Sequence, residues 1–422
     1  MVNERIRHGV ADPYGVGDLV VQGALLSGGA ARPGHFRPGT SLRAIVDQLC
    51  TVDPGVDVSG FTSGVLRNGV AAVWERGWQP RDLVHVAGQD PRPGRLAELA
   101  RLVVADEAGR TGARYRADAA WTEQLQDLGA FIPPAQPTVH HWAMTVRRPT
   151  AEIWTEALKL LGLVLQLPPL EMLGPCPSTW DNDRSTASRF VPNTVEPKML
   201  ARIRALLAKA ESTEFTEEAE ALTAKAQELI TRHAIDSVLI DDGSDQPPSI
   251  DVTARRVHID APYADAKATL FDAVARANGA RAVWDREFDM ATVVGVTMEL
   301  DLIELLFASL LVQATRAMSV EGSRAGAHHH SRSRAFRRGF LSAYASRIRQ
   351  RLAQAGADAI EEAGALHQTA LVPLMQQRDQ AVGAAFAEMF PHAGRRRSTR
   401  VDAAGWRAGV RAADRADMTM PG

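Results

Sequence analysis

The clearest pattern of apolar and polar positions lies in residues 197–240, where apolar side chains recur at helical spacing in two consecutive runs. The first run predicts a helix from about Lys198 to Ala210, and the second predicts a helix that follows a short polar turn. The first stripe holds Met199, Ile203, Leu206, Leu207 and Ala210, and the second holds Phe215, Ala219, Leu222, Ala226, Leu229, Ile230 and His233. Because a short connection favours antiparallel neighbours, we expect a helical hairpin. Its expected contacts are Ile203, Leu207, Leu222, Ala226 and Leu229.

The spacing of apolar residues and the content of glycine and proline divide the rest of the chain into further parts. Residues 1–40 are rich in glycine and proline, which predicts a flexible N-terminus. Residues 41–170 hold several amphipathic runs and predict a helical domain with its tryptophans in the core. Residues 171–196 and 241–250 have the composition of linkers, and residues 251–422 begin with strand, helix, strand, strand and helix. The predicted fold class is therefore α+β and mainly helical: a helical N-terminal region, the hairpin, and a C-terminal α+β domain.

The hairpin also shows a specific order of residues. Its first helix contains Ile203, Leu206-Leu207 and Ala210-Glu211-Ser212-Thr213, and its second contains Glu218-Ala219, Ala224-Lys225-Ala226-Gln227, Leu229-Ile230, His233 and Ile235. In this order and spacing the segment resembles domain of unknown function 2786, a family that occurs in bacterial and phage proteins. The resemblance covers about a tenth of the chain. It implies a helical hairpin, usually joined to a second domain, with no established activity.

Three polar positions of this motif are candidate functional residues, namely Lys225, Gln227 and His233. Polar residues on amphipathic helices mostly face solvent. The simpler interpretation therefore makes Lys225 a solvated arm, Gln227 a surface amide and His233 a helix-end residue.

Composition narrows the class of protein. The 422 residues are 45% hydrophobic and 23% charged, which is typical of a soluble globular protein of two or three domains. The net charge of −2 means that attraction to nucleic acid must come from local patches. Cys50 and Cys176 are too few for a disulfide framework or a cysteine zinc site, which favours a cytoplasmic location. The N-terminus lacks a long apolar core and the apolar runs are short, so we expect no membrane partner.

Arginine gives the strongest chemical bias. No acidic residue occurs between Gly322 and Ala357, and residues 333–355 predict a helix with one apolar face and an arginine-rich remainder. Guanidinium groups match phosphate geometry, so DNA or RNA binding is the first hypothesis, although acidic surfaces elsewhere could neutralise the same face. The candidate contacts are Arg334, Arg337, Arg338, Arg347 and Arg351, with a second cluster at Arg395, Arg396, Arg397 and Arg400.

Two other clusters support an alternative hypothesis, a metal-dependent hydrolase. His328-His329-His330 is a rare run, and Asp285, Glu287 and Asp289 lie together between two predicted strands. Neither cluster has the spacing of a recognised metal site, so we predict no metal and no cofactor. The glycine-rich N-terminus lacks the G-K-[ST] of a phosphate loop, and no catalytic residue is identified. A protein-interaction scaffold is the third hypothesis.

Overall fold

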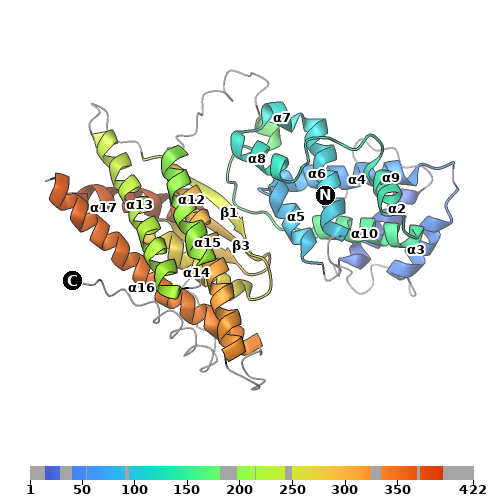
Figure 1. Ribbon diagram of the computed structural model, residues 1–422. Coiled ribbons are helices and arrows are strands. Elements are labelled where there is room, and N and C mark those ends of the chain that lie inside the picture. The colour runs from blue at the N-terminus through green and yellow to red at the C-terminus, as the bar shows by residue number, and fades with distance from the viewer. Residues whose placement is uncertain are drawn as a thin grey trace. The chain divides into compact units, whose positions relative to one another are not determined.

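The computed structural model describes residues 15–28, 40–53, 55–90, 95–180, 197–213, 215–242, 250–324, 334–367 and 371–392. The chain divides into two compact units, Met1–Val191 and Pro192–Gly422, which are described one at a time. Figure 1 shows helices throughout the first unit and helices around a small sheet in the second. The predicted fold class, α+β and mainly helical, is confirmed.

The described part of the first unit is helical. Its elements are α2 (Val16–Ser27), α3 (Leu42–Cys50), α4 (Val58–Trp74), α5 (Pro80–Gly88), α6 (Arg95–Thr111), α7 (Ala113–Arg116), α8 (Ala119–Asp127), α9 (Thr138–Val146), α10 (Thr150–Gln166) and the 3-10 turn η1 (Pro177–Thr179). The apolar helix α10 contacts α2, α3, α4, α6 and α9, so it organises the core of this unit.

The tryptophans of this unit lie in its core, as the sequence pattern predicted for Trp74, Trp78, Trp121, Trp142 and Trp154. Trp74 and Trp121 meet edge to face with ring centroids 5.2 Å apart, and Trp121 meets Trp180 in the same way at 5.3 Å. Trp180 is buried, although the sequence pattern placed it in a linker from 171 to 196. The indole of Trp180 donates to the carbonyl of Pro175 at 3.1 Å, so the start of that segment is packed structure. Residues 181–196 lie outside the described residues.

Helix α2 differs from the flexible N-terminus predicted for residues 1–40. Its glycines were interpreted as loop residues, yet they allow close packing of α2 against α10. A β-carbon at Gly23 would lie 2.6 Å from a methyl group of Leu158, and one at Gly162 would lie 2.3 Å from the carbonyl oxygen of Ala24. Side chains at these positions would separate the two helices. The Ser27 hydroxyl donates to the Leu158 carbonyl at 2.9 Å and secures the contact.

The hairpin opens the second unit as α12 (Pro197–Ser212) and α13 (Thr216–Asp242), which pack against each other. The predicted contact residues Ile203, Leu207, Ala226 and Leu229 are buried in one hydrophobic cluster, and Leu222 is half-buried. Phe215 was predicted to join this stripe, and that was wrong: it sits in the turn and is 73% exposed. The same cluster includes side chains from the strands and helices that follow, so the hairpin shares its core with the α+β part.

The α+β part contains three antiparallel strands and four helices among its described residues. Its elements are β1 (Val252–His258), α14 (Ala264–Ala277), β2 (Arg281–Asp285), β3 (Met290–Val296), α15 (Thr297–Arg324), α16 (Arg334–His367) and α17 (Leu371–Met389). The strand order is β1-β3-β2, so β3 is central and pairs with both neighbours. Val293 of β3 lies opposite Arg255 of β1, and Val294 lies opposite Arg281 of β2.

The sheet lies between two helical layers. Arg255 donates to Asp301 of α15 at 2.6 Å, whereas Arg281 lies 3.6 Å from Asp379 of α17. Their partners on β3 are consecutive residues, whose side chains point to opposite faces of a sheet. Helices α15 and α17 therefore cover opposite faces (Figure 1).

Helix α15 contains the one described segment, Thr297–Val320, that is long and apolar enough to cross a membrane. Its mean hydropathy is 1.4. Leu302, Ile303, Leu306 and Leu310 of this segment are fully buried in the core of the second unit. Core packing thus accounts for part of the apolar character of the helix, since 33% of its most apolar stretch is buried.

Candidate nucleic-acid interface

The predicted basic helix is present as α16, and its apolar side chains hold it to the second unit. Phe336, Phe340, Tyr344, Ile348 and Leu352 are buried, and α16 packs against α14 and α13. The rings of Phe340 and Tyr344 stack with centroids 6.4 Å apart. The spacing of these residues leaves the arginines at the edges of the helix or in solvent.

The first arginines of α16 lie at its exposed N-terminal end. Arg334 and Arg337 are exposed, and Arg338 is 44% exposed and pairs with Asp265 of α14. The first turn of α16 contains no acidic residue. Positive charge in a first turn is unfavourable because the helix dipole is positive there. This end of the helix is therefore electropositive, and Asp265 offsets that charge only in part.

The arginines further along α16 divide between two sides. Arg349 reaches Asp272 of α14 at 3.3 Å, and Asp272 also receives Arg276 at 2.9 Å. Arg347 is half-buried and donates to the side chain of Gln350 at 3.2 Å. Arg351 turns instead toward α13, where it pairs with Glu220. The five predicted contacts therefore do not lie in one row.

Arg351 is enclosed by protein. Its side chain is 10% exposed, and that of Glu220 is 14% exposed. The pair lines a small cavity of about 30 Å³, together with Thr223, Gln313 and Tyr344. Burial raises the pKa of Glu220 to about 7, although Arg351 opposes the shift, and burial also raises the pKa of Tyr344. A phosphate could reach Arg351 only by displacing this buried carboxylate.

The motif residues of the hairpin have three different surroundings. Lys225 is 45% exposed and binds Glu228 at 2.7 Å, which agrees with a solvated arm. Gln227 was interpreted as a surface amide, and that was wrong: it is fully buried. Its amide donates to the side chain of Asn278 at 2.9 Å and of Thr231 at 3.2 Å. His233 is half-buried, and desolvation lowers its pKa, with a smaller contribution from the charge of Arg378.

Next to this motif lies a buried ion pair that the sequence pattern did not reveal. Arg378 of α17 pairs with Glu299 in the first turn of α15, and their side chains are 5% and 2% exposed. Arg378 also donates to the backbone carbonyl of Asn278 at 3.1 Å. Burial lowers the pKa of Arg378 to about 10. In the sequence, Arg378 is a single arginine in a polar stretch of α17. Such an arginine cannot be distinguished from a charged surface residue by the sequence pattern.

The structure gives the acidic cluster a local role. The carboxylate of Asp285 accepts from the backbone N–H of Glu287 at 2.8 Å and of Phe288 at 3.3 Å, which stabilises the β2–β3 turn. No group of three or more histidine, cysteine, aspartate or glutamate side chains is arranged to hold a metal within the described ranges. The predicted clusters at His328–His330, at Arg395–Arg397 and at Arg400 lie outside those ranges.

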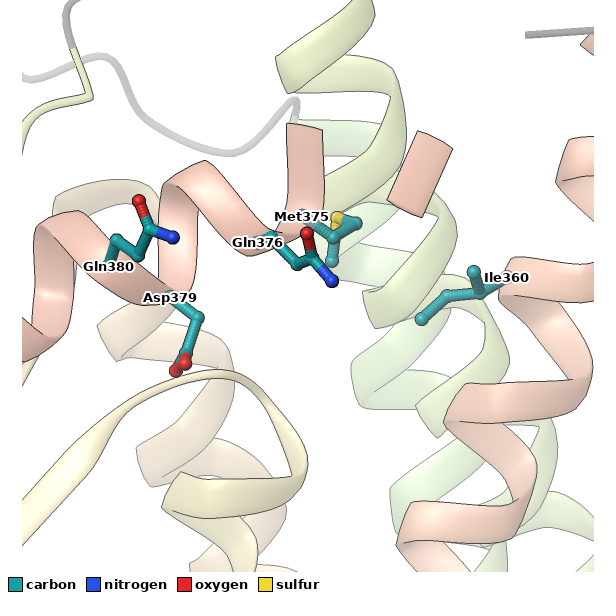
Figure 2. Close-up of a pocket in the computed structure, with 5 residues that line it drawn as sticks. All are labelled: Ile360, Met375, Gln376, Asp379 and Gln380. Carbon is teal, nitrogen blue, oxygen red and sulfur yellow. The ribbon is translucent and has the colours of Figure 1, made fainter. Parts of the chain in front are cut away.

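A surface depression of about 590 Å³ lies between α16 and α17. Figure 2 shows Ile360 of α16 and Met375 of α17 pointing toward each other, with Gln376, Asp379 and Gln380 along α17. Among the described residues that line it, Asp379 is the one ionisable side chain, and it lies 3.6 Å from Arg281. The lining residues that the structure describes include no pairing of a nucleophile with a base, so they do not resemble a hydrolytic site.

The comparison with protein families identifies the hairpin. The family described as a protein of unknown function (DUF2786) matches residues 198–237, which confirms the resemblance found in the sequence. The matched residues span α12 and most of α13. No curated protein and no solved structure gives a significant match to the chain.

Proposed function

We propose that this protein binds nucleic acid through the phosphate backbone, with the exposed arginines of α16 as contacts. The observation that supports this proposal is the excess of positive charge on that helix. Six arginines lie between residues 334 and 351 without one acidic residue. Arg338, Arg349 and Arg351 pair with Asp265, Asp272 and Glu220. Arg334 and Arg337 add positive charge at the exposed N-terminal end of the helix, and phosphates are the anions that clustered guanidinium groups bind best.

The contact set follows from the exposure of each side chain. Arg334 and Arg337 are exposed, while Arg338 and Arg349 are partly exposed on the side of α14. From Arg334 to Arg349 the helix rises about 22 Å, which matches about six to seven nucleotide steps along one strand of duplex DNA. Arg351 stabilises the fold through Glu220. Contacts of this kind give affinity without reading bases.

A salt titration of the full-length protein on duplex DNA tests the proposal. Wild type should bind, with affinity that falls linearly on a log–log plot against salt concentration. Arg334→Ala/Arg337→Ala should flatten that slope by about 0.9 for each lost phosphate contact, and equally on unrelated sequences. The matched control is Arg202→Ala/Arg204→Ala, which removes the same charge from exposed positions of α12. Absence of binding at low salt, or equal effects of both double variants, would refute the proposed surface.

A further inference from the structure

The first unit exposes a patch of aromatic and cationic side chains that the charge on α16 does not explain. The Arg114 patch consists of Arg114 and Tyr115 on α7 and Phe131 and Ile132 in the loop after α8. The guanidinium of Arg114 lies 5.9 Å from the ring centre of Tyr115 and 5.5 Å from that of Phe131. Tyr115 is 66% exposed and Ile132 is 81% exposed. The ring of Phe131 is half-buried. Large apolar side chains with the exposure of Tyr115 and Ile132 are typical of binding surfaces.

The patch is held by anchored backbone. Arg116 donates to the carbonyl of Thr111 at 3.2 Å and to that of Trp180 at 2.9 Å, which fixes α7 to the core. The loop beyond Phe131 rests on α6, because a β-carbon at Gly109 would lie 2.9 Å from the ring of Pro133. The exposed ring of Tyr115 and the half-buried ring of Phe131 are therefore held in a defined arrangement beside Arg114, which reduces the entropy lost when a ligand binds.

Of the two segments that carry the patch, the first holds basic side chains, and Asp118 and Asp127 adjoin the two segments in the sequence. Residues 108–117 contain three arginines and no acid, and residues 128–137 contain no charged side chain. Arg110 is neutralised by Glu107, whose carboxylate is buried and accepts from the guanidinium at 2.6 Å and 2.5 Å. Arg116 donates to backbone carbonyls, which leave its charge in place. Arg114 therefore brings positive charge to the two rings.

We propose that the Arg114 patch binds unpaired bases of single-stranded nucleic acid, which stack on Tyr115 and Phe131 while Arg114 contributes cation–π stacking and phosphate attraction. Rings beside guanidinium groups are the usual means of holding single strands, because every base offers a flat face. A duplex keeps its bases stacked on each other and cannot use such rings. The class of partner rests on the proposed function, but the surface is separate from α16 and adds a preference for single strands.

The test measures binding of the full-length protein to a fluorescently labelled 20-nucleotide oligo(dT) and to a duplex of the same length. Tyr115→Ala and Phe131→Ala should each weaken oligo(dT) binding by about 5- to 100-fold, the usual effect of removing one stacking ring. Duplex binding should stay unchanged. Tyr115→Phe keeps the ring and should retain affinity. Met144→Ala is the matched control, because Met144 on α9 is also 66% exposed.

Each outcome separates this inference from the proposed function. If Tyr115→Ala and Phe131→Ala leave oligo(dT) binding intact while the α16 variants weaken it, the stacking patch is refuted and the arginine surface stands. If the ring variants weaken oligo(dT) binding and the α16 variants change nothing, the patch stands and the α16 surface is refuted. If Ile132→Ala is as harmful as Tyr115→Ala and lowers the sedimentation coefficient, the patch is an apolar contact between copies. Absence of binding to either probe refutes both.

Discussion

The buried ion pair between Arg378 and Glu299 gives the sharpest test of how α17 is attached to the second unit. The perturbation is Arg378→Met, which keeps an unbranched side chain of similar length but removes the guanidinium. The variant loses the salt bridge to Glu299 and the hydrogen bond to the Asn278 carbonyl. Both are contacts between α17 and the ends of other helices, so their loss weakens the attachment of α17 to its sheet face.

The expected magnitude follows from the carboxylate that remains. Glu299 is 2% exposed, so without Arg378 its charge is buried and unpaired. Removing one partner of a buried pair destabilises by about 3–5 kcal/mol, whereas replacing both partners by apolar residues is often close to neutral. Arg378→Met/Glu299→Leu should therefore be more stable than Arg378→Met alone. It should remain slightly below wild type, because a carboxylate in the first turn of α15 contributes about 0.3–1 kcal/mol through the helix dipole.

The assay is urea unfolding of the full-length protein, with hydrogen exchange followed in peptides of α14 and α17 to isolate the second unit. The control is Arg281→Ala, which removes the 3.6 Å contact between Arg281 and Asp379, side chains that are 41% and 63% exposed. That exposed pair should be worth less than about 1 kcal/mol. If Arg378→Met cost no more than Arg281→Ala, or if the double variant were the least stable, the account of a buried unpaired charge would be wrong.

Two further predictions concern the hairpin and its neighbour. Leu207→Ala should destabilise the second unit by about 2–5 kcal/mol in the same urea assay, because Leu207 is 1% exposed. Leu206 is half-buried, so Leu206→Ala should lower the free energy of unfolding by less. Equal losses in the two variants would contradict the assigned packing. Glu220 has a folded pKa of about 7, above its ordinary 4.5, so the native state binds more protons between these values and stability should fall as pH rises through that window. Glu220→Gln should flatten this fall, and a pH profile identical to wild type would show that Glu220 ionises as it does in the unfolded chain.

Periodicity predicted the hairpin and its partners because apolar positions on a helix report burial directly. Ile203, Leu207 and Ala226 are buried as their spacing required. The same logic placed Phe215 in the core, but the chain turns there and the side chain lies outside the helix interface. The glycines of α2 led to the wrong prediction of a loop, because a glycine that allows close helix packing looks the same in sequence as a glycine in a loop.

The candidate site was predictable in part. The position of the basic helix and its apolar face follow from local spacing. Helix α16 begins where residues 333–355 predicted it, but it continues beyond residue 355 to His367. The distinction between Arg337, which is exposed, and Arg351, which is buried against Glu220, depends on a residue 131 positions earlier in the chain. The burial of Gln227 likewise depends on a distant part of the chain, because its hydrogen-bond partner Asn278 caps the C-terminal end of α14. The Arg114 patch joins α7 to a separate loop, which no local pattern could show.

The strand order of the sheet has a consequence for how the chain acquires its structure during synthesis. Both outer strands, β1 and β2, form their ladders with β3, which is the last of the three to leave the ribosome. The helices α12 and α13 can pair early, but neither ladder can begin before Met290 has emerged. The β2–β3 ladder is complete at Val294 and the β1–β3 ladder at Val296, and α17 has no complete sheet face to cover until then. The second unit can therefore fold cooperatively only late in synthesis, after the central strand β3 has inserted between β1 and β2.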